Sequence, residues 1–219
     1  GLVQVPVPGK SSQPYPWIKA WSELEQNPAL VWLRENPHRF SLGRVSLALK
    51  GRDGTAARFD QLTSTYQKLD MWTGTLTSRF TFDGEQVSVE TRMHPARDML
   101  LVDIRSKLVA EGRLGVDVRY PGVAAKFNPD PSDFVRDQLH SSDVITSAPG
   151  HALIKRTIDS TVYWSSIAAP NGNVTKSGQH QFHISAKSGD HLQVAVSFER
   201  KQPGSPASVK DGAGSVGPY

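Results

Sequence analysis

The sequence contains no cysteine, which excludes disulfides, thiolate metal ligands and cysteine nucleophiles. Its longest apolar run, around Met99–Val102, is far shorter than the roughly 20 residues that a membrane-spanning helix needs. Its 25 basic and 21 acidic residues are interspersed and form no clustered basic stripe of the kind that binds nucleic acid. These absences predict a protein with neither a nucleic-acid partner nor a membrane partner.

Short catalytic and cofactor signatures are missing as well. The sequence has no GxSxG elbow, no P-loop and no HExxH helix. His180 and His183 resemble a metal pair, but three residues apart on a strand they point to opposite faces. Asp130 and Asp133 lack the ligand spacing of a calcium loop, so solvated loop carboxylates are the commoner interpretation. We therefore expect no cofactor, no metal site and no self-contained catalytic residues.

The clearest structural pattern is a β-hairpin over residues 75–93. Apolar and polar residues alternate on either side of Asp83-Gly84, and glycine tolerates the positive φ that a type I′ turn needs. The alternation predicts a hairpin with one buried face. The residues expected on that face are Leu76, Ser78, Phe80, Phe82, Val87, Val89, Thr91 and Met93.

Similar alternation recurs along the rest of the chain. It is found over 45–49, 100–104, 114–118, 152–158, 162–168, 181–186 and 192–198. About ten short strands separated by turns, without a long helix, are typical of a sandwich. The sequence thus predicts an all-β fold, a large two-sheet antiparallel β-sandwich with a short helical N-terminal arm. Its expected core residues are Leu76, Phe80, Phe82, Val87, Val89, Val116, Val194, Val196 and Phe198.

Composition divides the chain into three parts. In residues 1–35, prolines predict an extended arm over 1–16, and apolar spacing predicts a short helix over 17–25. Residues 36–200 form the predicted sandwich, with a long loop over 121–142. Residues 201–219 are rich in Gly, Pro and Ser, which is typical of a linker or tail.

Two features favour a secreted or extracytoplasmic protein. The chain begins at Gly1, which indicates a removed leader or a trimmed chain. Asn173-Val174-Thr175 is an N-glycosylation sequon in a stretch that we expect to be a loop.

Two polar clusters have the residue types that bind sugars. One is Asn36-Pro37-His38-Arg39, directly before a predicted strand. The other surrounds the central hairpin and consists of Trp72, Arg79, His94 and Arg97. A sugar is held by an aromatic face together with planar hydrogen-bonding groups. The structural alternative is that Asn36 caps a turn, Trp72 lies in the core and Arg79 is an outward strand residue.

Three segments together carry a resemblance to a known family. They are NPHRFSLGRVSLAL at 36–49, LDMWTGTLTSRFTFDGEQVSVETRMHPARD at 69–98 and GRLGVDVRYP at 112–121. This series resembles the N-terminal β-sandwich of six-hairpin, (α/α)6-barrel glycoside hydrolases, which is similar to the galactose-mutarotase-like super-sandwich. The resemblance covers about residues 30–200.

The resemblance implies that the catalytic carboxylates come from a helical barrel that this chain does not contain. It therefore gives no residue of this chain a catalytic role and makes the chain alone inactive. It implies as partners a carbohydrate substrate and an (α/α)6 barrel, of the same protein or of a second chain. The residues that it places toward the substrate are Asn36, His38, Arg39, Trp72 and His94. Two alternatives are a free-standing carbohydrate-binding (lectin-like) β-sandwich and a structural domain without a sugar site.

A surface that packs on a barrel should expose apolar residues. We expect the contact patch to contain Trp17, Trp21, Leu30, Trp32 and Trp72. A lectin-like sandwich predicts instead a shallow polar groove with one exposed Trp.

Overall fold

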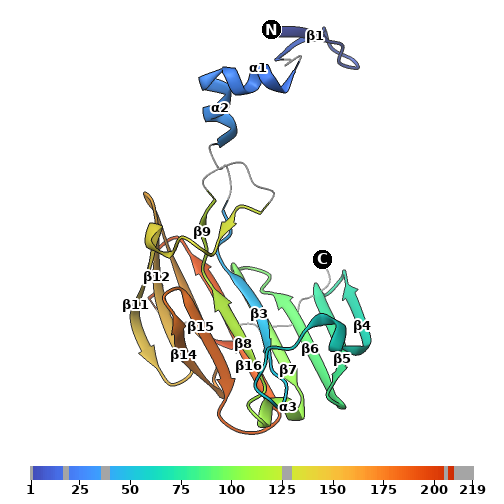
Figure 1. Ribbon diagram of the computed structural model, residues 1–219, viewed down its shortest axis with the longest axis vertical. Helices are drawn as coiled ribbons and strands as arrows, with labels where there is room; N and C mark the ends of the chain where they lie inside the picture. The colour runs from blue at the N-terminus through green and yellow to red at the C-terminus, as the bar shows by residue number, and fades with distance from the viewer. Residues whose placement is uncertain (1, 17–19, 36–39, 125–129, 205–206, 210–219) are drawn as a thin grey trace. The chain divides into compact units, whose positions relative to one another are not determined.

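A computed structural model describes residues 2–16, 20–35, 40–124, 130–204 and 207–209 (Figure 1). The chain forms two compact units. The smaller comprises Gly1–Phe40 and Val123–Ser132, and the larger comprises Ser41–Gly122 and Asp133–Tyr219. No helix within these described ranges is both long enough and apolar enough to cross a membrane.

The smaller unit contains a β-hairpin and two short helices. Strand β1 (Leu2–Val5) pairs antiparallel with β2 (Gln13–Pro16), so the segment predicted to be extended is a hairpin of two extended strands. The prolines are tolerated because both strands of a two-stranded ladder are edges. Helix α1 (Trp21–Gln26) overlaps the predicted helical segment 17–25 and ends one residue beyond it, and α2 (Pro28–Glu35) follows. Asn27 caps α2, its Oδ1 accepting the Ala29 N–H at 3.0 Å.

The larger unit contains two antiparallel sheets, which confirms the predicted all-β, two-sheet sandwich. The large sheet has eight strands in the order β11-β12-β13-β16-β7-β6-β5-β4, and the small sheet has four in the order β14-β15-β8-β3. Strands of the large sheet are β4 (Thr63–Asp70), β5 (Thr75–Phe82), β6 (Glu85–Met93), β7 (Met99–Arg105), β11 (His140–Ala148), β12 (His151–Ile158), β13 (Thr161–Ala168) and β16 (His191–Glu199). Those of the small sheet are β3 (Arg44–Leu49), β8 (Leu114–Arg119), β14 (Gly172–Gly178) and β15 (Gln181–Ala186).

Short elements connect these strands. They are η1 (Phe59–Gln61), α3 (Lys107–Ala110), β9 (Gly122–Val123), β10 (Ser132–Asp133) and η2 (Asp137–Leu139). The segment 121–142, expected to be a loop, thus contains β9, β10, η2 and the start of β11. The glycosylation sequon lies on β14, an edge strand, and not in the loop that the sequence suggested.

The central hairpin has the predicted turn and faces. Asp83 and Gly84 both have positive φ, 51° and 82°, as a type I′ turn requires. Phe80 pairs with Val87 and Ser78 with Val89, so the apolar positions of both strands share one face. We call the face of the large sheet that packs on the small sheet its inner face, and the opposite one its outer face.

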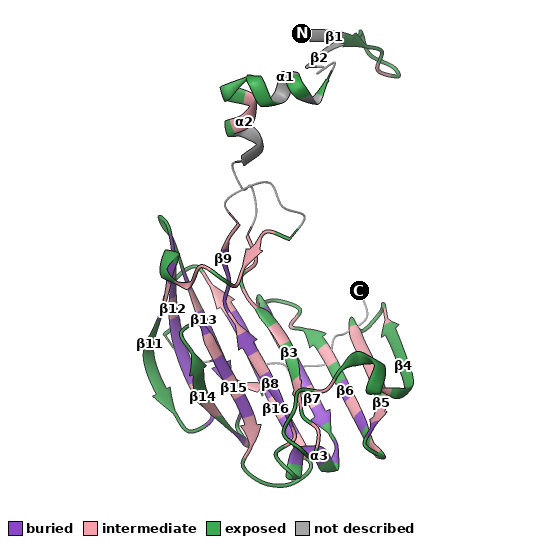
Figure 2. Ribbon diagram, viewed as in Figure 1, coloured by how far each residue is buried: buried purple, intermediate pink, exposed green. Residues whose placement is uncertain are grey.

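The core fills the space between the sheets (Figure 2). Six predicted core residues are buried, and they are Phe82, Val87, Val89, Val116, Val194 and Val196. Phe80 and Phe198 are partly buried against this core. Leu76 is only half-buried and was wrongly assigned to it.

Leu76 lies beyond the small sheet because the large sheet is twice as wide. One inner row crosses the large sheet from Val102 through Thr91 and Leu76 to Leu69. Exposure rises along this row from 7% at Val102 to 53% at Leu69. Strands β5 and β4 thus extend past β3, the last strand of the small sheet (Figure 1).

Two further features concern the order of strands and the outer face. Although β16 is the last strand in the described chain, it lies between β13 and β7 near the middle of the large sheet. After it, Ala207 and Val209 pack on an outer-face cluster formed by Met99, Leu101, Ala168 and Ala195. This part of the predicted linker or tail is therefore docked on the sandwich.

Candidate functional site

The structure describes two of the five residues that were predicted to contact sugar. Asn36, His38 and Arg39 lie outside the described residues. Trp72 lies in the β4–β5 turn and His94 in the β6–β7 turn. Because Thr75 pairs with Arg92, these turns lie at the same end of the large sheet.

Trp72 is held on a turn that presents its side chain to solvent. The Oδ1 of Asp70 accepts the backbone N–H groups of Trp72 at 2.9 Å and Thr73 at 3.2 Å. Gly74 closes the turn with a φ of 62°, which glycine adopts without strain. Trp72 is 82% exposed, so the alternative that it lies in the core is wrong.

The other members of the hairpin cluster lie apart. His94 accepts the N–H of Ala96 at its Nδ1, 3.0 Å away, which fixes the β6–β7 turn. Arg97, in the same turn, donates to Glu199 Oε1 at 3.0 Å. Arg79 faces outward from β5 opposite Ser88, several residues from the Trp72 turn. The structure therefore does not bring Arg79 together with Trp72.

An exposed apolar patch surrounds the Trp72 turn. It consists of Leu69, Met71, Trp72 and Met93, which are 53%, 81%, 82% and 57% exposed. Beside it, an apolar cleft of about 180 Å³ opens between β3 and the inner face of β5 and β6. Soluble monomers rarely expose contiguous large apolar groups, so such a patch is suited to a second surface or to the apolar face of a sugar.

The structure contains a buried polar cluster around Arg156 that the sequence did not predict. This side chain is fully buried, and its partners come from segments far apart in the chain. Its guanidinium donates to Pro121 O and His140 Nδ1, both at 2.9 Å, and to Ser142 Oγ at 2.6 Å. It also donates to Ser141 O and lies 5.3 Å from the Tyr120 ring centroid. Within the described chain, these partners of the buried charge are all neutral.

The hydrogen bonds fix the states of two histidines in this cluster. Because an arginine can only donate, His140 Nδ1 must accept and the proton lies on Nε2. His180 likewise has its proton on Nε2, which donates to Asp137 O at 2.9 Å. Burial, and then the charge of Arg156, lower the pKa of His140 to about 4. Burial also lowers the pKa of His180.

These proton positions argue against a metal site. Asp137, His140 and His180 offer ligand atoms within 4.8 Å of one another. Metal binding needs a free lone pair on each imidazole, but both Nδ1 lone pairs accept hydrogen bonds and both Nε2 atoms carry protons. The adjacent guanidinium repels a cation as well. The cluster therefore fits a buried hydrogen-bond network with a structural role better than it fits a metal centre.

The candidate metal pair from the sequence does not converge. His180 joins the buried cluster, where its Nδ1 lies 2.7 Å from Ser142 Oγ. His183 instead lies 2.7 Å from Asp117 Oδ1 on the face of the small sheet that points away from the core. The two rings are separated, as expected, although His180 lies in the β14–β15 turn and only His183 lies on β15 (Gln181–Ala186).

No model of a known protein family matches this sequence, and no curated protein matches it.

Proposed function

We propose that this chain is the non-catalytic β-sandwich of a glycoside hydrolase, which packs on a helical catalytic barrel and helps to shape its substrate pocket. The observation that carries the proposal is the apolar patch at one end of the large sheet, with Trp72 and His94 on adjacent turns. The patch supplies contact surface, and these two side chains supply an aromatic face and a planar polar group for a sugar.

The shape of the sandwich supports this proposal. Because β5 and β4 extend past β3, their inner face provides a ledge that another domain can cover. An interface between domains usually buries at least about 600 Å² and is more apolar than the remaining surface. In this arrangement the barrel provides both carboxylates that glycosidic cleavage requires.

The alternative is a free-standing carbohydrate-binding sandwich. The highly exposed Trp72 favours it, because sugar-binding surfaces use an exposed aromatic ring as a platform. Under this alternative the patch contacts sugar and no barrel exists.

Intact mass and activity of the natural protein distinguish the two. The protein should be captured from its source with an antibody against this chain, and then assayed on a panel of aryl glycosides. The proposal expects hydrolysis, together with a longer polypeptide or a second chain that carries a helical domain. A mass near 24.0 kDa without a second chain and without hydrolysis would refute it.

Substitution of Trp72 tests the site itself. In the natural protein, Trp72→Ala should raise KM or lower kcat/KM for oligosaccharides without changing the fold. Phe59→Ala is the matched control, because Phe59 is 86% exposed and lies on the β3–β4 connection. If the two substitutions change KM and kcat/KM equally, the assignment of Trp72 to the site is wrong.

A further inference from the structure

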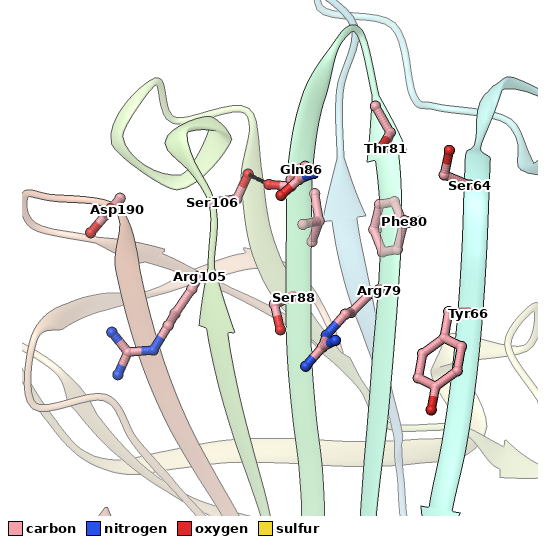
Figure 3. Close-up of a pocket in the computed structure, with 11 residues that line it drawn as sticks. Ser64, Tyr66, Arg79, Phe80, Thr81, Gln86, Ser88, Arg105, Ser106 and Asp190 are labelled. Carbon is pink, nitrogen blue, oxygen red and sulfur yellow. Dashed lines mark hydrogen bonds between the residues drawn. The ribbon is translucent and has the colours of Figure 1, made fainter.

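The outer face of the large sheet carries a groove of about 650 Å³ beside the β5–β6 turn (Figure 3). A row of paired residues crosses it, in which Arg79 lies opposite Ser88 and Ser88 opposite Arg105. Neighbouring strands are about 4.8 Å apart, so the arginines stand two strand spacings apart with a small side chain between them. The two arginine positions thus flank Ser88, one on each side.

Neither guanidinium is neutralised by a close ion pair. Within the part of the chain that the structure describes, Arg79 has no side-chain hydrogen bond or ion pair. Arg105 has only Asp103, with 3.6 Å between Nε and Oδ1. The carboxylate of Asp103 already lies 2.9 Å from His191 Nε2 and accepts from Gln193 Nε2 at 2.8 Å.

The acidic groups near the groove are few. Asp190 lies at its margin, and the paired residues Glu90 and Asp103 face outward on the next row of the sheet. Two arginines against one aspartate line the groove itself, which gives it a net positive charge. An anion therefore gains more here than on the surrounding mixed surface.

The remaining lining groups suit a sugar better than a simple ion. Tyr66 lies opposite Arg79 at one side of the groove, with half of its surface exposed. Thr81, Gln86 and Ser88 provide hydroxyl and amide groups along the floor. Figure 3 shows Arg79 reaching toward Ser88, with Tyr66 on the far side of Arg79, whereas Arg105 extends away from Ser88 on the opposite side of the groove. A groove of this size exceeds a single ion and falls in the usual range of ligand sites.

We propose that this groove binds an acidic saccharide, with a uronate carboxylate between Arg79 and Arg105 and a sugar ring against Tyr66. The planar fork of a guanidinium matches a carboxylate, which favours a uronate over a neutral sugar. The groove is on the outer face, whereas the ledge formed by β5 and β4 is on the inner face. The inference therefore holds with or without a catalytic barrel.

Calorimetric titration of the full chain with a galacturonate tetrasaccharide tests this proposal, with the fully methyl-esterified tetrasaccharide as the neutral probe. The acid should bind at least about tenfold more tightly than the ester, because charge-assisted hydrogen bonds are lost in the ester. Its affinity should also fall with added salt. Absence of binding, or equal binding of acid and ester, would overturn the proposal.

Matched substitutions locate the site. Arg79→Gln and Arg105→Gln should each weaken binding about tenfold. Ser88→Glu should abolish binding, because it places between the arginines a negative charge that repels the uronate carboxylate. Arg92→Gln is the control, because Arg92 faces outward on β6 outside the groove, and its effect should stay within about twofold. Thermal unfolding confirms that each variant is folded.

Two outcomes would count against this assignment. If Arg92→Gln weakens binding as much as Arg79→Gln, the attraction is general and the groove is not a site. If a sulfated tetrasaccharide binds and the galacturonate does not, the carboxylate assignment is wrong.

Discussion

The guanidinium of Arg156 is buried among neutral hydrogen-bond acceptors, and this arrangement makes the sandwich sensitive to acid. His140 can accept from Arg156 only while its imidazole is neutral. A proton on His140 would place two positive charges 2.9 Å apart at their nearest atoms. Burial, and then this repulsion, hold the pKa of His140 at about 4, well below the ordinary value of 6.5.

We expect the free energy of unfolding to fall as the pH drops from about 6.5 to about 4. In this window the unfolded chain binds a proton at His140 that the folded chain excludes, so the stabilisation present above pH 6.5 is lost progressively. Urea unfolding between pH 7 and pH 4 measures this, with His140→Gln as the test because glutamine keeps an acceptor that does not titrate. In this variant the free energy of unfolding should change less steeply with pH. Part of the pH dependence should remain, because the pKa of His180 is also lowered.

His94→Asn serves as the control, because asparagine also offers an acceptor to the Ala96 N–H in an exposed turn. It should leave the slope unchanged. An unaltered slope in His140→Gln would show that His140 does not cause the acid sensitivity.

The phenylalanines of the central hairpin differ in burial and should differ in stability. Phe82 is 2% exposed within the core, so Phe82→Ala should lower the unfolding free energy by about 3–5 kcal/mol. Phe80 is only partly buried, so Phe80→Ala should lower the unfolding free energy by about half as much. Phe59→Ala, at an exposed position, should change stability by less than about 0.5 kcal/mol. Equal losses for Phe80 and Phe82 would contradict the uneven cover by the small sheet.

At the scale of an element, two turn glycines allow the cost of backbone strain to be distinguished from the cost of a steric clash. Gly84 has a φ of 82°, and an added Cβ would meet no atom within 4 Å. Gly150 has a φ of 76°, but there an added Cβ would overlap the carbonyl oxygen of Ala169. Gly84→Ala should therefore cost about 1 kcal/mol, the strain of a left-handed residue alone.

Gly150→Ala should cost about 3 kcal/mol, because backbone atoms must also move. Chemical denaturation of both variants measures the difference. Similar losses would show that the β11–β12 turn relaxes at little cost.

Sequence patterns identified the interior strands and one edge strand, β3, but not the other edges. Strand β5 was recognised because its apolar side chains alternate toward a packed face. Strand β4, the edge of the large sheet, is exposed along nearly its whole length, so the sequence TSTYQKLD shows no apolar alternation. The edge strands β11 and β14 were missed for the same reason. A strand held mainly by backbone hydrogen bonds leaves little pattern in its side chains.

The same reasoning explains what was found of the candidate sites. Trp72 and His94 were recognisable because both stand next to the hairpin in sequence. The Arg156 cluster was not, because Pro121, His140 and His180 approach Arg156 only through tertiary folding. The groove around Arg79 and Arg105 depends on strand register, which places residues distant in sequence in one row.

For the whole molecule, we expect no glycosidase turnover from this chain alone. The proposed function assigns both the acid and the base or nucleophile to the barrel, and loss of such groups lowers rates by several powers of ten. Release of nitrophenol from a panel of aryl glycosides by the purified chain measures this. Hydrolysis that is abolished by changing one Asp or Glu of this chain would contradict the expectation.

The position of β16 has a consequence for how the protein is made. During synthesis β4–β7 and β11–β13 leave the ribosome first, as two separate halves whose facing edges, β7 and β13, have no neighbour. Only when residues 191–199 emerge can one strand join the halves. Until then, both halves expose unpaired strand edges of the kind that aggregate. A ribosome that stalls before residue 191 would therefore leave a nascent chain that depends on chaperones, although most of its core residues have already been synthesised.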